Sequence, residues 1–430
     1  MTTWWCERAW LDGRPVESVR LTGSDVLETV AVGPRGSADV ALHGLVLPGM
    51  ANAHSHAFHR ALRGRTHAGG GSFWTWREQM YALAAVLDPD SYRALARAAF
   101  AEMVLAGWTA VGEFHYLHHA PDGRRYDDPN AMSLALVEAA AEAGIRLTLL
   151  DTCYLQGGLD GRALEGPQRR FGDGDVDAWQ ERIAGLADGP VVRHGVAAHS
   201  VRAVPPDALR AVAAHGLRHI HLSEQPAEND DCLAVLGRTP TQLLDEAGFL
   251  GPGACAVHAT HLTDDDLRRL ASTAVCMCPT TERDLADGIG PARRLTGPVC
   301  LGSDQHAIVD PFEEARGLET DERLASRERG RFSPAELVDA LTVHGYDALG
   351  WLGGLRVGSV VDLVAVALDS PRTAGSDPAQ VVMSATAADV TDVVVGGRHV
   401  VRDGRHELGD VGRLLTAAMS SSPHGRLSGR

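Results

Sequence analysis

The sequence of 430 residues predicts an α/β fold, a closed (β/α)8 TIM barrel that carries a small β-sandwich domain. Short apolar runs rich in Val, Ile, Leu and Ala alternate with longer amphipathic segments through the middle of the chain, which is typical of a parallel sheet with helical crossovers. Eight such runs can be counted, enough to close a barrel. Nearly every run ends in a potentially catalytic side chain, and such barrels build their active sites at the carboxyl ends of the strands.

The strands and helices can be placed in chain order. The eight strands are expected to end near His54, His115, Tyr154, His199, His221, His258, Pro279 and Asp304. The crossover helices are expected over residues 92–106, 131–143, 206–215, 239–247 and 264–271. Because parallel strands present their carboxyl ends at one mouth of a barrel, the polar side chains that end these strands should converge there.

Both ends of the chain have a different pattern, with short alternating strands and Gly-rich turns. Residues 1–46 and 355–415 are expected to form the β-sandwich domain together, and residues 47–354 to form the barrel. Within the second segment, Gly396-Gly397 is expected to join two strands as a hairpin. Residues 416–430 are expected to be a flexible tail.

The composition narrows the possible functions. The formal net charge of −16 argues against nonspecific binding to nucleic acid or to anionic membranes, because both need a basic protein face. A small-molecule substrate is therefore expected. No stretch approaches the ~18 apolar residues of a membrane span, and the first residues do not resemble a secretory signal, so a cytoplasmic protein is expected.

Lysine is absent, and the seven cysteines include no C-x-x-C pair. The absence of lysine excludes Schiff-base chemistry and a carbamylated lysine that bridges two metals. The cysteines lie mostly in apolar runs, where cysteine behaves as a small hydrophobic residue, so they are expected to be reduced and part of the core.

His54 and His56 form the strongest signal of chemistry. In an extended strand, side chains two residues apart point the same way, so both imidazoles can bind one metal ion. With His221 on the fifth strand and Asp304 on the eighth, four ligands converge at the barrel mouth. Three imidazoles and one carboxylate suit one Zn²⁺ ion, with Fe²⁺ as the second choice, and an open position for a water whose pKa the metal lowers. Hydrolysis is the chemistry that this arrangement predicts.

Glu224, His258 and Asp304 are the predicted acid and base groups. Glu224 lies three residues beyond His221, where the strand turns into a loop, so its carboxylate can face the bound water. His258 ends the sixth strand beside the metal and can act with Asp304 in deprotonating that water. Deamination needs a group that carries a proton to the leaving nitrogen, and Glu224 is expected to be that group.

These motifs together resemble the amidohydrolase superfamily, in its mononuclear deaminase branch. The resemblance covers the whole chain and is carried by Pro48-Gly49-Met50 before His54-Ser55-His56, by His221-Leu222-Ser223-Glu224, by His258 and by Gly302-Ser303-Asp304. Four narrower segments are similar to the formimidoylglutamate deiminases, namely residues 72–81, 111–119, 199–205 and 278–282. The reaction that this resemblance implies converts N-formimino-L-glutamate and water into N-formyl-L-glutamate and ammonia, a step of histidine degradation.

By position, the resemblance implies that Arg77, Tyr116, His199 and Arg202 hold the substrate. A substrate with two carboxylates and a cationic amidine needs guanidinium groups at one end and carboxylates at the other, which agrees with this assignment. Two positions depart from the family pattern: His59 stands beside the substrate where glutamine is typical, and Gln305 follows Asp304 where serine is usual. The resemblance also implies a homodimer.

Two alternative functions remain open from the sequence. A deaminase of a nucleobase or nucleoside, such as guanine, adenosine or cytosine, shares the metal motif but would favour aromatic stacking and amide hydrogen bonds over two arginines. A noncatalytic metal-binding homologue would keep the fold without turnover, and the presence of Glu224 and His258 argues against it.

Overall fold

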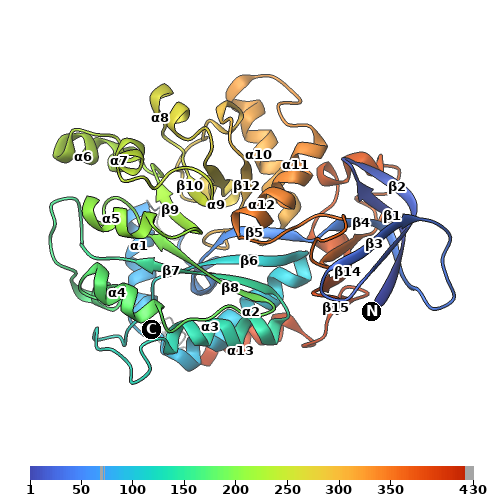
Figure 1. Ribbon diagram of the computed structural model, residues 1–430, viewed down its shortest axis with the longest axis horizontal. Coiled ribbons are helices and arrows are strands. Elements are labelled where there is room, and N and C mark those ends of the chain that lie inside the picture. The colour runs from blue at the N-terminus through green and yellow to red at the C-terminus, as the bar shows by residue number, and fades with distance from the viewer. Residues whose placement is uncertain (68–70, 72, 422–430) are drawn as a thin grey trace.

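The computed structural model describes residues 1–67, 71 and 73–421 (Figure 1). Its centre is a barrel of eight parallel strands, each hydrogen-bonded to the next in chain order. Ser55 forms a parallel bridge with Asp304, which brings the last strand back to the first. The predicted barrel is confirmed, with strands β5 (Met50–Ser55), β6 (Trp108–His115), β7 (Arg146–Cys153), β8 (Val192–Ala198), β9 (Arg218–Leu222), β10 (Ala254–His258), β11 (Ala274–Met277) and β12 (Val299–Leu301).

Helices surround the barrel and connect its strands (Figure 1). All five crossover helices expected from the sequence are present, with ends that differ from the expected ones by a few residues. They are α2 (Pro89–Ala106), α3 (Ala131–Ala143), α5 (Pro206–Ala213), α7 (Pro240–Glu246) and α8 (Asp264–Arg269). The others are α1 (Phe73–Ala84), α4 (Val176–Ile183), α6 (Pro226–Leu236), α9 (Pro279–Asp284), α10 (Pro311–Ser326), α11 (Pro334–Leu341), α12 (Val343–Ala348) and α13 (Val411–Ser421).

The sequence of α2 shows why these helices begin and end where they do. Asp88 and Ser91 form a capping box, in which the side chain of each residue accepts a hydrogen bond from the backbone N–H of the other. Pro89 occupies the first helical position, where its missing N–H is not needed. Gly107 ends the helix in the left-handed region, at φ 107°.

The two chain ends form a second sheet beside the barrel, on the right in Figure 1. Its strand order is β16-β15-β14-β13-β4-β1-β2-β3, so the first and last segments of the chain lie side by side. The described strands form a single hydrogen-bonded sheet, and the expected sandwich is not confirmed. The strands are β1 (Thr2–Leu11), β2 (Arg14–Gly23), β3 (Leu27–Val32), β4 (Val40–Pro48), β13 (Leu363–Val366), β14 (Val390–Val395), β15 (Arg398–Arg402) and β16 (Arg405–His406).

The expected hairpin at Gly396-Gly397 joins β14 to β15, since Val395 pairs with Arg398. Strand β4 continues the small sheet to Pro48, and only Gly49 separates it from β5. A Cβ atom on residue 49 would lie 2.4 Å from the hydroxyl of Thr109 and 2.5 Å from that of Tyr346, so this junction requires glycine. The division of the chain at residues 46/47 and 354/355 stays a prediction.

The tail expected from residue 416 is instead helical as far as Ser421. Helix α13 packs against α2, and Leu415 and Ala418 are buried there, because the segment presents apolar side chains on one face. Residues 422–430, which the sequence also assigned to the tail, lie outside the described residues. All seven cysteines are buried and unpaired, as expected. Among the described helices, none combines the length and apolar character needed to cross a membrane.

Candidate active site

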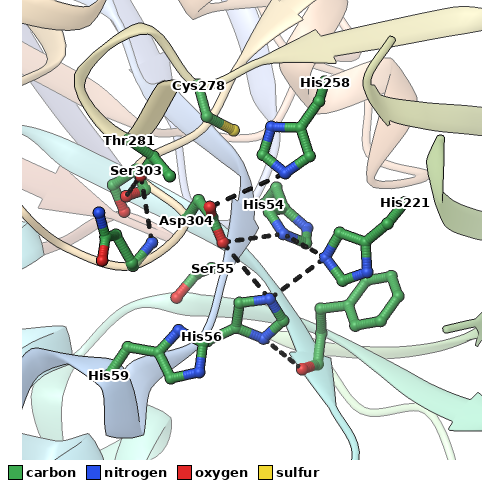
Figure 2. A network of polar contacts seen from close by, with 12 residues as sticks. His54, Ser55, His56, His59, His221, His258, Cys278, Thr281, Ser303 and Asp304 are labelled. Atoms are coloured by element: carbon green, nitrogen blue, oxygen red, sulfur yellow. Dashed lines mark hydrogen bonds and ion pairs between the residues drawn. The ribbon is translucent and has the colours of Figure 1, made fainter. Parts of the chain in front are cut away.

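Three imidazoles and one carboxylate meet at the carboxyl end of the barrel (Figure 2). His54 and His56 lie at the end of β5, His221 lies on β9, and Asp304 lies in the loop after β12. The ligand atoms form a closed ring. The Nε2 atom of His221 is 3.1 Å from that of His54 and 3.3 Å from that of His56. The Oδ1 atom of Asp304 is 3.3 Å and 3.4 Å from the same two nitrogens.

The backbone fixes the tautomer of two of these imidazoles. The Nδ1–H group of His56 donates to the carbonyl of Phe114 at 2.9 Å, and that of His221 donates to the carbonyl of His199 at 2.9 Å. Burial lowers the pKa of both imidazoles well below the usual value, so each ring is neutral and its Nε2 atom carries a lone pair. Two lone pairs that face each other at 3.3 Å repel, and a cation between them removes the repulsion.

The ring of ligand atoms has the size that a small metal ion needs. Ligand bonds of about 2.0–2.2 Å place tetrahedral ligand atoms about 3.3–3.6 Å apart, and the four sides of the ring measure 3.1–3.4 Å. Other combinations of neighbouring side chains could also bind a metal ion. In two such sets all ligand atoms lie within 4.8 Å of one another: His54, His221, His258 and Asp304 form the first, and His56, His59 and Asp304 form the second. The Nε2 atom of His258 is the more distant neighbour, at 3.8 Å from Oδ2 of Asp304.

A buried carboxylate on β6 holds the segment that carries the first two imidazoles. Glu113 accepts a hydrogen bond from the hydroxyl of Ser55 at 2.7 Å and from the backbone N–H of Ala57 at 2.7 Å, one residue to either side of His56. Burial raises the pKa of Glu113 to about 8. The sequence assigned no role to Glu113, although the segment 111–119 marked its position.

The loop that carries Asp304 is held as closely. Asn52 on β5 accepts from the backbone N–H of Ser303 at 2.9 Å and donates to its hydroxyl at 2.7 Å. A Cβ atom on residue 302 would lie 2.8 Å from the carbonyl oxygen of His54, so β12 can approach β5 only with glycine at this position. The spacing of the Gly302-Ser303-Asp304 motif thus follows from the closure of the barrel.

Glu224 and His258 lie beside these ligand atoms. The Nε2 atom of His258 is 3.7 Å from Oε1 of Glu224. Burial raises the pKa of Glu224 to about 7. Burial alone would lower the pKa of His258, but the nearby carboxylates, Glu224 first, raise it well above the usual value. The pKa of Asp304 is about 2, because His54 and His258 outweigh the effect of burial. The predicted acid and base groups are thus adjacent and electrostatically coupled.

A cavity opens from this cluster toward an outer pocket. Arg77, Arg202, His199 and Tyr154 line both spaces, whereas Glu224, His258 and Asp304 line only the inner cavity. Within the inner cavity, guanidinium groups therefore stand at the end that faces the outer pocket and carboxylates at the opposite end, and the outer pocket itself is also lined by Asp160 and Asp231. The inner cavity is lined by His56, His59, Trp76, Arg77, Met80, Tyr81, Tyr116, Tyr154, Phe171, His199, Arg202, His221, Glu224, His258, Leu285 and Asp304.

The sequence profile described as "Amidohydrolase family" matches residues 45–400. The chain belongs to the amidohydrolase family. A formimidoylglutamate deiminase of Pseudomonas aeruginosa is 40% identical to it over 94% of this chain and 96% of its own length. An 8-oxoguanine deaminase of the same organism is 30% identical over 86% of this chain and 85% of its own. The crystal structure of an amidohydrolase from Brucella melitensis has a TM-score of 0.89 and 32% identity, over 98% of this chain and 99% of that one.

All five residues expected to contact the substrate of this amidohydrolase line the cavity. Arg77 lies on α1 with its guanidinium carbon 5.6 Å from the ring centre of Tyr81. Arg202 lies with Nε 3.6 Å from Oε1 of the buried Glu228. The Nε2 atom of His59 is 3.0 Å from the hydroxyl of Tyr116, and His199 follows β8. The positions agree with the expectation, and the roles stay a prediction.

Gln305, the second departure from the family pattern, does not line this cavity. Its amide donates to Asp284 at 2.8 Å and its side chain lines a separate hollow with His67. Of the segment 72–81, Ser72 lies outside the described residues. Several aromatic residues to which the sequence assigned no role at the site also line the cavity, namely Tyr81, Tyr154, Phe171 and Trp76; of these, Tyr154 was expected near the mouth as the end of a strand. Trp76 and Tyr81 lie within the segment 72–81, so a signal for them was present.

A second group of potential ligands, His115, His118 and Asp151, lies buried elsewhere in the amidohydrolase. Both oxygens of Asp151 accept hydrogen bonds from Arg182, each at 2.8 Å. The guanidinium thus already neutralises the only anion of the group, which makes a structural ion pair the simpler interpretation.

Proposed function

We propose that this amidohydrolase is a metal-dependent deiminase that hydrolyses N-formimino-L-glutamate to N-formyl-L-glutamate and ammonia, as in histidine degradation. The observation that carries the proposal is the polarity of the cavity, with Arg77 and Arg202 at the outer end and Glu224 and Asp304 at the inner end. This order matches a substrate with two carboxylates on one side and a cationic amidine on the other. The 40% identity to a formimidoylglutamate deiminase supports the same substrate.

One zinc ion per chain is the metal that we propose, with ferrous iron as the second choice. His54, His56, His221 and Asp304 would hold it, because their ligand atoms form a ring with sides of 3.1–3.4 Å and two of the imidazoles offer a lone pair. When bound, such a metal acts as a Lewis acid and makes a water nucleophilic at neutral pH. Elemental analysis of active protein should give one metal per chain.

The residues around the metal site would then divide the work of the reaction. Arg77 and Arg202 bind the two carboxylates and orient the amidine toward the inner end, with Tyr116, His199 and His59 beside the substrate. Asp304 accepts a proton from the attacking water, and His258, with Nε2 3.8 Å from Oδ2 of Asp304, assists by stabilising the negative charge on that carboxylate.

Glu224 would complete the proton transfer at the inner end of the cavity. Its carboxyl group gives a proton to the departing nitrogen, and the carbon–nitrogen bond breaks with release of ammonia. The hydroxyl that came from the water then returns a proton to the Glu224 carboxylate as the formyl C=O bond forms. Because the amidine is already cationic, attack on its carbon needs less polarisation than attack on an amide. Formyl-glutamate, still held by the arginines, leaves toward the outer pocket.

Deamination of an aromatic base is the second candidate function. The cavity contains the rings of Trp76, Tyr81, Tyr154 and Phe171, which could stack on a base, and a relative at 30% identity is an 8-oxoguanine deaminase. The two guanidinium groups favour the dianionic substrate instead.

One panel separates these functions. Ammonia release should be measured from N-formimino-L-glutamate, guanine, 8-oxoguanine, adenosine and cytosine at equal concentrations. We expect rapid release from the first alone. Release mainly from a base would replace the proposal with the second candidate, and no release from any substrate by metal-loaded protein would favour the noncatalytic homologue. The homodimer stays a prediction, which light scattering on the purified protein would test.

A further inference from the structure

The segment from Cys278 to Glu282, which the sequence marked without a function, follows β11 and begins helix α9. Pro279 occupies the first turn of that helix. The backbone N–H of Cys278 donates to Oε1 of Glu282 at 2.8 Å, so the side chain of Glu282 reaches back over the helix start. The segment is buried throughout. In Figure 2, Cys278 and Thr281 lie at the upper left, on the side of the ring of ligand atoms where Asp304 and Ser303 are drawn.

Thr281 holds the backbone on both sides of Asp304. Its hydroxyl donates to the carbonyl of Ser303 at 3.3 Å and accepts from the backbone N–H of Gln305 at 3.4 Å. These two bonds enclose the one residue that belongs both to the proposed metal ligands and to the proposed acid and base groups. Figure 2 shows Thr281 beside Ser303.

The backbone at Asp304 needs such support. Its φ angle is +42°, in the left-handed region that costs free energy for any residue with a side chain. Residues persist in that region only where their surroundings enforce it. Asn52 enforces it from β5 through Ser303, and Thr281 does so from α9.

Glu282 contacts the second group in the same way. Its Oε1 atom lies 3.4 Å from Nδ1 of His258. His258 also has a left-handed backbone, with φ +67°. The carboxylate of Glu282 accepts the hydrogen on Nδ1 and orients the ring so that Nε2 faces Glu224 and Asp304, at 3.7 Å and 3.8 Å.

The segment is itself anchored from outside the site. Glu314 on α10 is fully buried and accepts from the hydroxyl of Thr280 at 2.5 Å and from its backbone N–H at 3.0 Å. The position of Thr281 and Glu282 is therefore set by a helix that takes no part in the cavity.

We propose that residues 278–282 form a positioning bracket, in which Thr281 fixes the backbone that carries Asp304 and Glu282 fixes the ring of His258. The role of these two groups in the reaction rests on the proposed function, whereas the contacts do not. Thr281 and Glu282 are positioning residues, since neither lines the cavity.

Thr281 is tested by two variants. Thr281→Val keeps the shape and removes the hydroxyl, and Thr281→Ser keeps the hydroxyl. Zinc affinity should be measured on chelator-stripped protein by competition with a chromophoric chelator, and kcat and KM with N-formimino-L-glutamate. We expect Thr281→Val to lose about tenfold or more in zinc affinity and in kcat, with little change in KM. Thr281→Ser should behave as the wild type.

Substitution of Glu282 is expected to change kcat without changing zinc affinity. Glu282→Ala removes the acceptor, so kcat should fall about tenfold or more while zinc affinity and KM stay near the wild-type values. Glu282→Gln keeps an acceptor oxygen and should recover most of that loss. This pattern, with zinc affinity lost only in Thr281→Val, is not expected from a general loosening of the fold.

The bracket is overturned if Thr281→Val binds zinc as the wild type does, or if Thr281→Ser is equally impaired. It is also overturned if Glu282→Ala reduces zinc affinity and kcat together. The zinc measurement needs no substrate, so it decides the role of Thr281 even if the wild type releases no ammonia from N-formimino-L-glutamate. An absence of ammonia release by the wild type would overturn the proposed function and leave the role of Thr281 to the zinc measurement.

Discussion

Asp362 connects the small sheet to the amino end of the barrel strands through a buried ion pair. Replacing it tests how much this ion pair contributes to the stability of the fold. Its carboxylate accepts from Arg146 on β7 at 2.8 Å and 3.2 Å, from the hydroxyl of Tyr346 at 2.5 Å and from the backbone N–H of Gly396 at 2.7 Å. The side chains of Asp362 and Arg146 are each 1% exposed. Replacing Asp362 by alanine therefore leaves a buried guanidinium without its counter-ion.

The expected loss is large. Removing one partner of a buried ion pair costs about 3–5 kcal/mol, and the orphaned hydroxyl and N–H donors add to that cost without full additivity. A total of about 4 kcal/mol is a large share of the about 5–15 kcal/mol that holds a typical domain folded. Removing the charge on Arg146 as well should recover part of it, because burying an unpaired charge is the main penalty.

Equilibrium unfolding in urea measures these differences. Asp362→Ala, Arg146→Met and the double variant should be followed by tryptophan fluorescence, since Arg146 stacks 5.0 Å from the ring centre of Trp351. We expect the double variant to be more stable than Asp362→Ala, by about 2 kcal/mol. Arg124→Met, which removes an exposed ion pair with Asp122, is the control and should unfold as the wild type does.

Two results would refute this reasoning. A loss below about 1 kcal/mol in Asp362→Ala would mean that the buried guanidinium finds water or another partner. A double variant less stable than either single variant would mean that packing rather than charge dominates. Folded Asp362→Ala should retain kcat, because Arg146 begins β7 at the end of the barrel away from the site.

The other predictions concern the site and the response to acid. Glu224→Gln should keep its metal and lose kcat by about 10²-fold or more, by elemental analysis and ammonia assay; near-normal activity would assign the proton transfer elsewhere. Arg202→Ala should lose about 2–5 kcal/mol of preference for the full substrate over formamidines without carboxylates, and Arg202→Lys should not restore it; equal processing by wild type and variant would make Arg202 structural. Burial alone would raise the pKa of Asp173, but His119 and Arg182 lower it from 3.8 to about 2. Its stabilising contribution, about 2 kcal/mol, is present above about pH 4 and is lost as the pH falls through 2, so Asp173→Asn should show a shallower loss of unfolding free energy in that range.

The barrel could be predicted from the sequence because its signals are local. Each strand is a short apolar run, and parallel strands place their carboxyl ends at one mouth, so the convergence of His54, His221 and Asp304 follows from strand order alone. The spacing of His54 and His56 needed only the period of a strand. Predicting the barrel therefore required only the order of the strands and no knowledge of contacts between distant side chains.

The remaining features depend on pairings that sequence periodicity does not encode. The strand β13 pairs with β4, more than 300 residues earlier, and this pairing makes the second sheet continuous. The contacts of Ser303, in the loop after β12, reach Thr281 on helix α9 and Asn52 on strand β5. Motif similarity marked residue 281 but could not show what its hydroxyl touches. The side chain of Gln305 likewise bonds to Asp284, at the end of helix α9, and the sequence pattern does not show this neighbour.

The last strand returns to the first through very few backbone bonds, and these have a thermodynamic consequence. The N–H of His56 donates to the carbonyl of Asp304 at 3.1 Å, and the N–H of Asp304 donates to the carbonyl of His54 at 3.0 Å. The residues that close this seam are the ones that we propose as ligands, so metal occupancy and seam closure form one linked equilibrium. At a free metal concentration a hundred times Kd, metal binding stabilises the closed barrel relative to the open one by about 2.7 kcal/mol. Amide hydrogen exchange at His56 and Asp304 should therefore accelerate when the metal is stripped, while exchange on β7 and β8 stays slow. The rate of amide exchange at His56 and Asp304 would then measure how much of the protein carries metal.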